Sequence, residues 1–176
     1  DESEPVSLTN DLNWLMPGIK GVENLEARAL TQFLFPASGQ AGDRFCVRNS
    51  GALAIVEGCG ANGCEYMTGG EVVILGNIGD NFGAGMTGGS AFIYSDQKNL
   101  TEMMNKETIQ AYQILEENWK KYLFKLLTSF SEETKSKRAS YIIENFEQEI
   151  LKFIHVVPNE VIDKLNYPVI EQHKIA

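Results

Sequence analysis

The sequence has few cysteines, few histidines and no long apolar run, and each shortage disfavours a class of protein. Three cysteines cannot all pair with one another, so a secreted disulfide scaffold is disfavoured and a reducing, cytoplasmic compartment is predicted. No run of about 18 apolar residues is present, so no transmembrane helix is expected. Two histidines leave little material for Ser-His-Asp catalysis.

Basic residues are also scarce. The 176 residues include 15 Lys and Arg against 24 Asp and Glu, for a net charge of −9. Proteins that bind nucleic acid or anionic membranes are normally basic, so both roles are disfavoured. The excess of acid lies in residues 1–96, which hold 12 acids and four bases. The opening residues carry no methionine, which predicts a chain processed or excised from a longer protein.

Glycine is abundant up to residue 89 and absent after it. Fourteen of the 16 glycines lie between Gly39 and Gly89, and none follows. Together with the charge shift, this predicts a boundary near Asp96 between a β-rich part and a helical part. The predicted divisions are an N-terminal extension or cap at 1–30, a Gly-rich β-helix at 31–96 and a helical segment at 97–176.

The Gly-rich part repeats with a period of 18–19 residues. Units at 42–56, 60–74 and 79–93 follow one another, and the tetrapeptide Met67–Gly70 recurs as Met86–Gly89. Each unit ends in a β-branched or aromatic run, which predicts a short strand. Such a period is typical of a solenoid, in which each unit buries its apolar face against its neighbours. A left-handed hexapeptide β-helix is excluded, because its aliphatic residue at every sixth position is missing.

Glycines between the strands are predicted to be structural turns, where φ is positive or two backbones approach closely. The stretch 83–88 spells Gly-x-Gly-x-x-Gly, but a strand-like run follows it where a dinucleotide site needs a helix. The predicted turn residues are Gly51, Gly63, Gly69, Gly70, Gly83, Gly85, Gly88 and Gly89.

Apolar residues after Asp96 recur at three- and four-residue steps, which predicts amphipathic helices. One stripe runs from Ile109 to Phe130. Ser131 is a candidate N-cap for a second helix with a stripe from Ala139 to Phe153, and Asn159 for a short third one. The first two helices would form a helical hairpin. Upstream of the repeats, a short helix at 22–30 and a strand at 31–35 are predicted.

No residue set gives a convincing catalytic or metal site. Cys46, Cys59 and Cys64 form no Cys-x-x-Cys pair and are predicted to be buried structural thiols. His155 lies in an apolar run and is predicted to be packed or at the surface. An independent enzyme, such as a carbohydrate-active β-helix, would need acids such as Glu57, Glu65 and Asp80 to converge on one groove.

Three segments closely resemble a known family. Residues 42–51 (Gly-Asp-Arg-Phe-Cys-Val-Arg-Asn-Ser-Gly), 63–70 (Gly-Cys-Glu-Tyr-Met-Thr-Gly-Gly) and 81–89 (Asn-Phe-Gly-Ala-Gly-Met-Thr-Gly-Gly) resemble the C-terminal GXGXG domain of the glutamate synthase large (alpha) subunit. Residues 138–142 and 153–158 are similar to that family's closing segment. The resemblance covers most of residues 34–165.

The resemblance implies a right-handed parallel β-helix that serves as a non-catalytic scaffold between catalytic domains. No catalytic, cofactor-binding or metal-binding residue is carried over to this chain. FMN and a 3Fe-4S cluster are implied only for the parent enzyme, an oxidoreductase that makes glutamate from glutamine and 2-oxoglutarate in ammonia assimilation. The family's β-helix has several earlier coils, which are not found in residues 1–32.

The expected partners are other glutamate synthase domains or subunits, and a homo-oligomer is kept as a further option. The alternative function is a stand-alone interaction subunit that docks redox or amidotransferase chains. A stable complex with separately encoded synthase domains would distinguish this subunit from a spacer within one chain.

Overall fold

The computed structural model describes residues 34–36 and 39–176. The predicted N-terminal cap at 1–30 and the predicted helix at 22–30 lie outside the described residues. None of the helices in the described ranges is long and apolar enough to cross a membrane.

A mixed sheet of six strands organises the fold, in the spatial order β1-β2-β3-β4-β6-β5. The first four strands are parallel, and β6 pairs in antiparallel fashion with both β4 and β5. The strands are β1 (Leu34–Pro36), β2 (Ser50–Val56), β3 (Thr68–Ile74), β4 (Gly88–Tyr94), β5 (Ile109–Gln113) and β6 (Phe153–Pro158).

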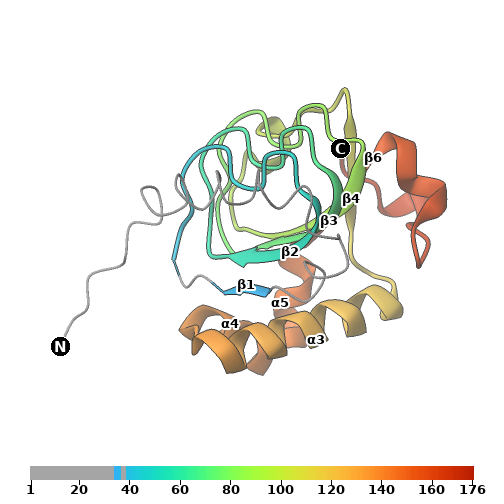
Figure 1. Cartoon of the computed structure of the whole chain (residues 1–176). Helices are drawn as coiled ribbons and strands as arrows, with labels where there is room; N and C mark the ends of the chain where they lie inside the picture. Colours follow the sequence, from blue (N-terminus) through green and yellow to red (C-terminus); the bar gives the residue numbers. More distant parts are fainter. Residues whose placement is uncertain (1–33, 37–38) are drawn as a thin grey trace.

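The 18–19-residue repeat appears as the register of the parallel strands. Ala54 of β2 pairs with Val72 of β3, which pairs with Ala91 of β4. Equivalent residues of successive units therefore lie side by side, and the three predicted repeat strands are confirmed. The loops that join them arch over one face of the sheet, while the helices cover the other (Figure 1).

Both faces of the sheet are buried, and successive residues alternate between two cores. In β3, Val72 and Ile74 pack beneath the loops, in a cluster that includes Phe82. Val73 points to the opposite face and packs in a second cluster with Leu123 of the helical layer. This alternation follows from the two-residue period of a strand. With both faces covered, even the central strands read as continuous apolar runs.

Two helices of the tail form the predicted hairpin, with different boundaries. Helix α3 (Glu117–Thr134) contacts α4 (Lys137–Glu144), and two residues join them. Ser131 lies inside α3, so its prediction as an N-cap is wrong. The cap is Ser136, whose hydroxyl accepts a hydrogen bond from the Ala139 amide at 3.1 Å. Lys135 adopts a left-handed conformation that ends α3.

The two predicted helical stripes, from Ile109 and up to Phe153, extend into residues that form strands. Ile109–Gln113 forms β5, and Phe153–Pro158 forms β6 between β4 and β5. Both segments are short, and over five or six residues periodicity does not separate a helix from a strand. Pairing with strands distant in the sequence decides the outcome.

Shorter helices complete the tail. Asn159 begins a 3-10 helix, but Pro158 occupies its N-cap position, so the predicted cap is wrong by one residue. The remaining elements are α5 (Phe146–Glu149) and the 3-10 helices η1 (Leu100–Glu102), η2 (Ile150–Lys152), η3 (Asn159–Lys164) and η4 (Glu171–His173).

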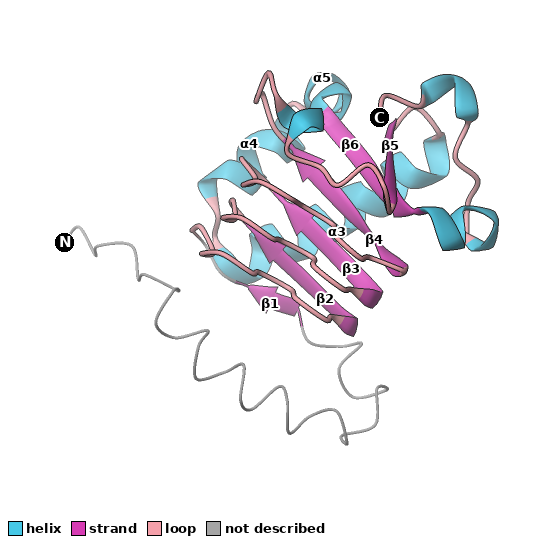
Figure 2. Cartoon of the chain, turned by 90° about the horizontal axis from the view of Figure 1, so that it is seen from above, coloured by secondary structure: helices cyan, strands magenta, loops and turns pink. Residues whose placement is uncertain are grey.

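The tail strands continue the sheet of the Gly-rich part (Figure 2). The fold is therefore a mixed sheet with a helical layer, and its parallel half carries the repeats. A right-handed β-helix is not confirmed by this arrangement and stays a prediction.

Candidate functional site

The Gly-x-Gly segment lies in the loop before β4. Every second residue from Asn81 to Gly85 has a positive φ, so left-handed and right-handed backbone conformations alternate along it. Asn81, Gly83 and Gly85 have φ values of 60°, 74° and 64°. The preceding loops repeat this pattern at equivalent positions, although none of the residues there is glycine. These residues are Arg44, Cys46 and Arg48 in the first loop and Asn62, Cys64 and Tyr66 in the second.

Alternating hand lets each loop hydrogen-bond through its backbone to the loops beside it. The Asn62 amide donates to the Asp80 carbonyl at 2.8 Å, and the Tyr66 amide donates to the Ala84 carbonyl at 2.8 Å. The Gly83 amide donates in the opposite direction, to the Gly63 carbonyl at 2.8 Å. The loops are thus tied together by main-chain bonds, as the strands are.

Different constraints act at the predicted turn glycines, either a positive φ or a close approach of neighbouring atoms. Gly70, Gly83, Gly85 and Gly89 have positive φ. A side chain at Gly63 would approach the Phe82 ring, at 2.8 Å. A Cβ at Gly69 would lie 2.6 Å from the Ser50 carbonyl oxygen, and one at Gly88 would overlap the Thr68 carbonyl. Gly51 has neither constraint, because a Cβ there would meet open space.

An asparagine ladder crosses the outer side of the loops. The Asn81 amide group donates to Oδ1 of Asn62 at 3.0 Å, and the Asn105 amide group donates to Oδ1 of Asn81 at 3.0 Å. Asn62 and Asn81 both have positive φ, a conformation that asparagine tolerates better than most residues. The ladder stabilises the stacking and offers no reactive group.

The three cysteines contribute side chains to the core beneath the loops. Burial raises the pKa of the Cys59 thiol to about 12 and also raises the pKa values of Cys46 and Cys64. Iron and other soft metals bind thiolates, which this environment disfavours. Within residues 34–36 and 39–176, no group of three or more Cys, His, Asp or Glu is placed to hold a metal ion.

Two of the three acids considered for an independent enzyme, Glu57 and Glu65, have separate partners. Glu57 accepts hydrogen bonds from the Ser136 hydroxyl at 2.5 Å and from the Gly39 amide at 3.1 Å. Glu65 forms an ion pair with Arg44 at 3.5 Å. The Glu57 carboxylate thus joins the helical layer to the sheet, and Glu65 joins two loops.

The sequence predicted that His155 is either packed or at the surface. In the structure His155 of β6 is buried. Its Nε2 lies 3.1 Å from the Ser90 hydroxyl, and its ring stacks on Phe92 with centroids 4.5 Å apart. Burial lowers the pKa of His155 to about 3, from an ordinary value of 6.5. A Ser-His pair of this kind is a feature of nucleophilic catalysis only where a substrate can reach it, and both side chains here are buried.

Two further polar contacts could not be found by sequence reasoning. The Tyr122 hydroxyl of α3 donates to Glu71 of β3, and the Tyr94 hydroxyl of β4 donates to Glu149 of α5. The second carboxylate also forms an ion pair with Lys152 at 2.9 Å. The Tyr94 and Lys152 hydrogen bonds lower the pKa of Glu149. The partners lie more than 50 residues apart, so no local pattern signals them.

The buried His155 predicts a pH dependence of stability. Between about pH 6.5 and pH 3, the unfolded chain binds a proton that the folded chain excludes. The free energy of unfolding should therefore fall as the pH is lowered through this window, by up to about 1.4 kcal/mol per pH unit. Urea unfolding of wild type and His155→Gln at pH 7, 6 and 5 checks this, since the variant should show the shallower dependence. Equal slopes would contradict the assignment.

A known family and several known proteins match most of this chain, including the repeat units. The family described as "GXGXG motif" matches residues 30–159. The glutamate synthase [NADPH] large chain of Azospirillum brasilense is 48% identical over 133 residues, which cover 76% of this chain and 9% of that protein. The ferredoxin-dependent glutamate synthase of Antithamnion sp. is 43% identical over 126 residues, covering 72% of this chain and 8% of that one.

A third relative is the glutamate synthase [NADH] of Schizosaccharomyces pombe, 43% identical over 123 residues, or 70% of this chain and 6% of that protein. The chain thus spans less than a tenth of the length of these relatives. The Gly-x-Gly segment at residues 83–85 lies within the matched range, and the match extends through β6. The chain therefore belongs to the GXGXG-motif family and corresponds to the GXGXG domain of the glutamate synthases.

Proposed function

We propose that the chain is a structural domain of a glutamate synthase assembly, which holds catalytic domains in register and has no turnover of its own. The observation that carries this proposal is the continuous stacking of strands and loops. Main-chain hydrogen bonds link each unit to the next on both sides of the core, for example Ala41 to Gly58 and Cys59 to Asn77. Such a framework resists shear between its units, which suits a spacer.

We further propose that the parallel strands and stacked loops are coils of a right-handed β-helix. Support comes from the constant register of β2, β3 and β4 and from the connection rule that parallel crossovers are right-handed. The antiparallel pairing of β6 on β4 would then end the coils. A crystal structure that traces the loops with the opposite hand would contradict this proposal.

The partners are proposed to be the other domains or subunits of a cytoplasmic glutamate synthase, and they would hold the FMN and the 3Fe-4S cluster. The lengths of the matched relatives support this, because more than nine-tenths of each lies outside the matched region. The packing of the three cysteines in the core beneath the loops supports placing the cluster elsewhere.

Affinity capture from an extract of the source cells tests the scaffold role. The tagged chain should recover glutamate synthase chains, identified by mass spectrometry. An unrelated tagged protein of similar net charge should not recover them. The purified chain alone should form no glutamate from glutamine and 2-oxoglutarate with a reductant supplied. A folded bait that recovers no synthase chain, or a chain active alone, would overturn the proposal.

A further inference from the structure

The helical layer is hollowed on its outer side, between α3 and the segment formed by α4 and α5. Residues 143–148 line a hollow of about 300 Å³. Ile143 and Glu144 also line an adjoining hollow of about 230 Å³, whose other wall comes from Thr128, Ser131 and Glu132 of α3 and Ser140 of α4. The two hollows together are called the α3–α5 groove below.

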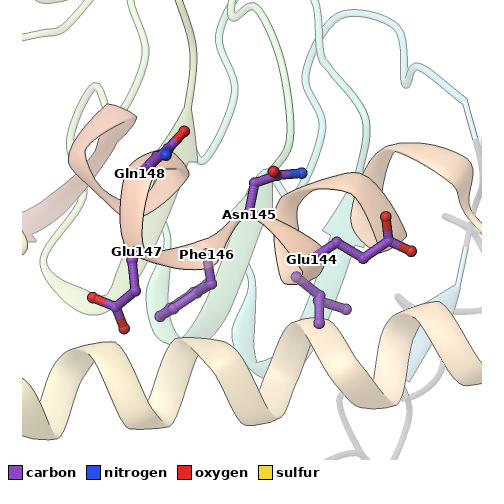
Figure 3. A pocket seen from close by; sticks show the side chains of 6 residues that line it. Glu144, Asn145, Phe146, Glu147 and Gln148 are labelled. Atoms are coloured by element: carbon purple, nitrogen blue, oxygen red, sulfur yellow. The ribbon is translucent and has the colours of Figure 1, made fainter.

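Part of the groove is apolar and open to solvent. Phe146 points from α5 toward α3 (Figure 3). Its ring packs edge-on against Phe124 of α3, with centroids 4.9 Å apart. Phe124 is 40% exposed, although α3 buries its opposite face against the sheet. A phenylalanine pair left partly in water beside Ile143 offers an anchor point for an apolar side chain.

The charged side chains that line the groove are all acidic. Glu132 comes from α3, Glu144 from α4 and Glu147 from α5, and all three are exposed. Among the residues lining the two hollows, none is Lys or Arg. Glu147 points toward α3 beside Phe146 (Figure 3). Ile143 and Phe146, with these acids around them, are complementary to a basic amphipathic segment, while Phe124 lies on α3 between the exposed Lys121 and Lys125.

The charge also argues against two other occupants. Residues 1–33 of the chain carry six acids and two bases, so they do not complement the groove. A second copy would bring a net charge of −9 to an acidic surface, where like charges repel. A basic segment of a different polypeptide fits better than either.

We propose that the α3–α5 groove docks a basic amphipathic segment of a partner polypeptide. This inference rests on the proposed scaffold function and adds the chemistry of one contact. The partner's apolar side chains would contact Phe124, Ile143 and Phe146, and its Lys or Arg side chains would pair with the three glutamates. Salt should weaken the complex, because exposed ion pairs are screened.

A designed peptide of about 18 residues tests the groove, with leucine on one helical face and lysine on the other. Its fluorescence anisotropy is titrated with the full chain. Glu132→Lys/Glu144→Lys/Glu147→Lys should weaken binding at least about tenfold. Glu133→Lys/Glu160→Lys/Asp163→Lys changes the net charge equally at exposed sites outside the groove and should weaken it less than about threefold. NMR shift changes should be centred on residues 143–148.

Several outcomes would overturn the proposal: no binding at about 100 µM, equal effects of the two triple variants, or equal binding of a matched leucine–glutamate peptide. A dimer of the free chain that only the groove variant dissociates would replace the partner with a second copy, and would also overturn it. The titration contains no synthase chain, so its failure is distinguishable from failure of the scaffold role, which the affinity capture tests separately.

Discussion

Gly88→Val should unfold the chain at room temperature. Gly88 opens β4 and pairs with Thr68 of β3, and a Cβ there would overlap the Thr68 carbonyl oxygen and lie 2.7 Å from its carbon. Both atoms belong to the backbone of a central strand, so no side-chain rotation relieves the overlap. The strands would have to separate, breaking bonds such as Gly88 to Met67. We expect a loss of more than about 4 kcal/mol, enough to unfold a marginal domain.

Circular dichroism and urea unfolding measure this effect. Gly51→Val is the matched control, because it places the same side chain in a repeat strand where a Cβ meets nothing within 4 Å. It should change the free energy of unfolding by less than about 1 kcal/mol. A Gly88→Val protein with a wild-type spectrum and unfolding midpoint would show that β3 and β4 are not paired as described.

Phe92→Ala should be the most destabilising truncation of a side chain between the sheet and the helices. Phe92 is fully buried on the helical face of β4. Its ring lies 5.7 Å from Trp119, 6.2 Å from Tyr122 and 4.5 Å from His155, between centroids. Truncation removes contacts with α3 and β6 together and leaves a cavity, at a cost of about 3–5 kcal/mol. Thermal unfolding should show a clearly lowered midpoint.

Phe124→Ala serves as the comparison for Phe92→Ala. Phe124 lies on α3 but is 40% exposed and contacts Phe146. Its truncation should cost about 1 kcal/mol or less. Equal losses for the two variants would mean that the helical layer is not packed on β4 through Phe92.

Much of the parallel half of the fold could be predicted from the sequence. The repeat period predicted three strands ending in Val56, Leu75 and Tyr94, and the structure pairs them with that spacing. These features are local and recur, so each unit supports the interpretation of the next. The boundary that the glycine distribution predicted near Asp96 stays a prediction.

The structure of residues 97–176 could be predicted only in part. The stripe through Trp119 and Phe130 correctly predicted a helix, because α3 buries one face over its whole length. Extending it back to Ile109 was wrong, and so was placing Phe153 at the end of a helix. These runs join the sheet because β4 offers an open edge to β6, a contact across about 60 residues of sequence that no short window contains.

By itself, the sequence determined the repeat and the spacing of the parallel strands, since glycine spacing and apolar alternation act within a few residues. Membership of the GXGXG family follows from the residues that the chain shares with its relatives. Only the tertiary structure decided which polar groups meet. It placed His155 against Ser90, Tyr122 against Glu71 and Ser136 against Glu57. These partners lie 51 to 79 residues apart. The pairing of β6 with β4 brings His155 to Ser90, and the packing of helices on the sheet brings the other two pairs together.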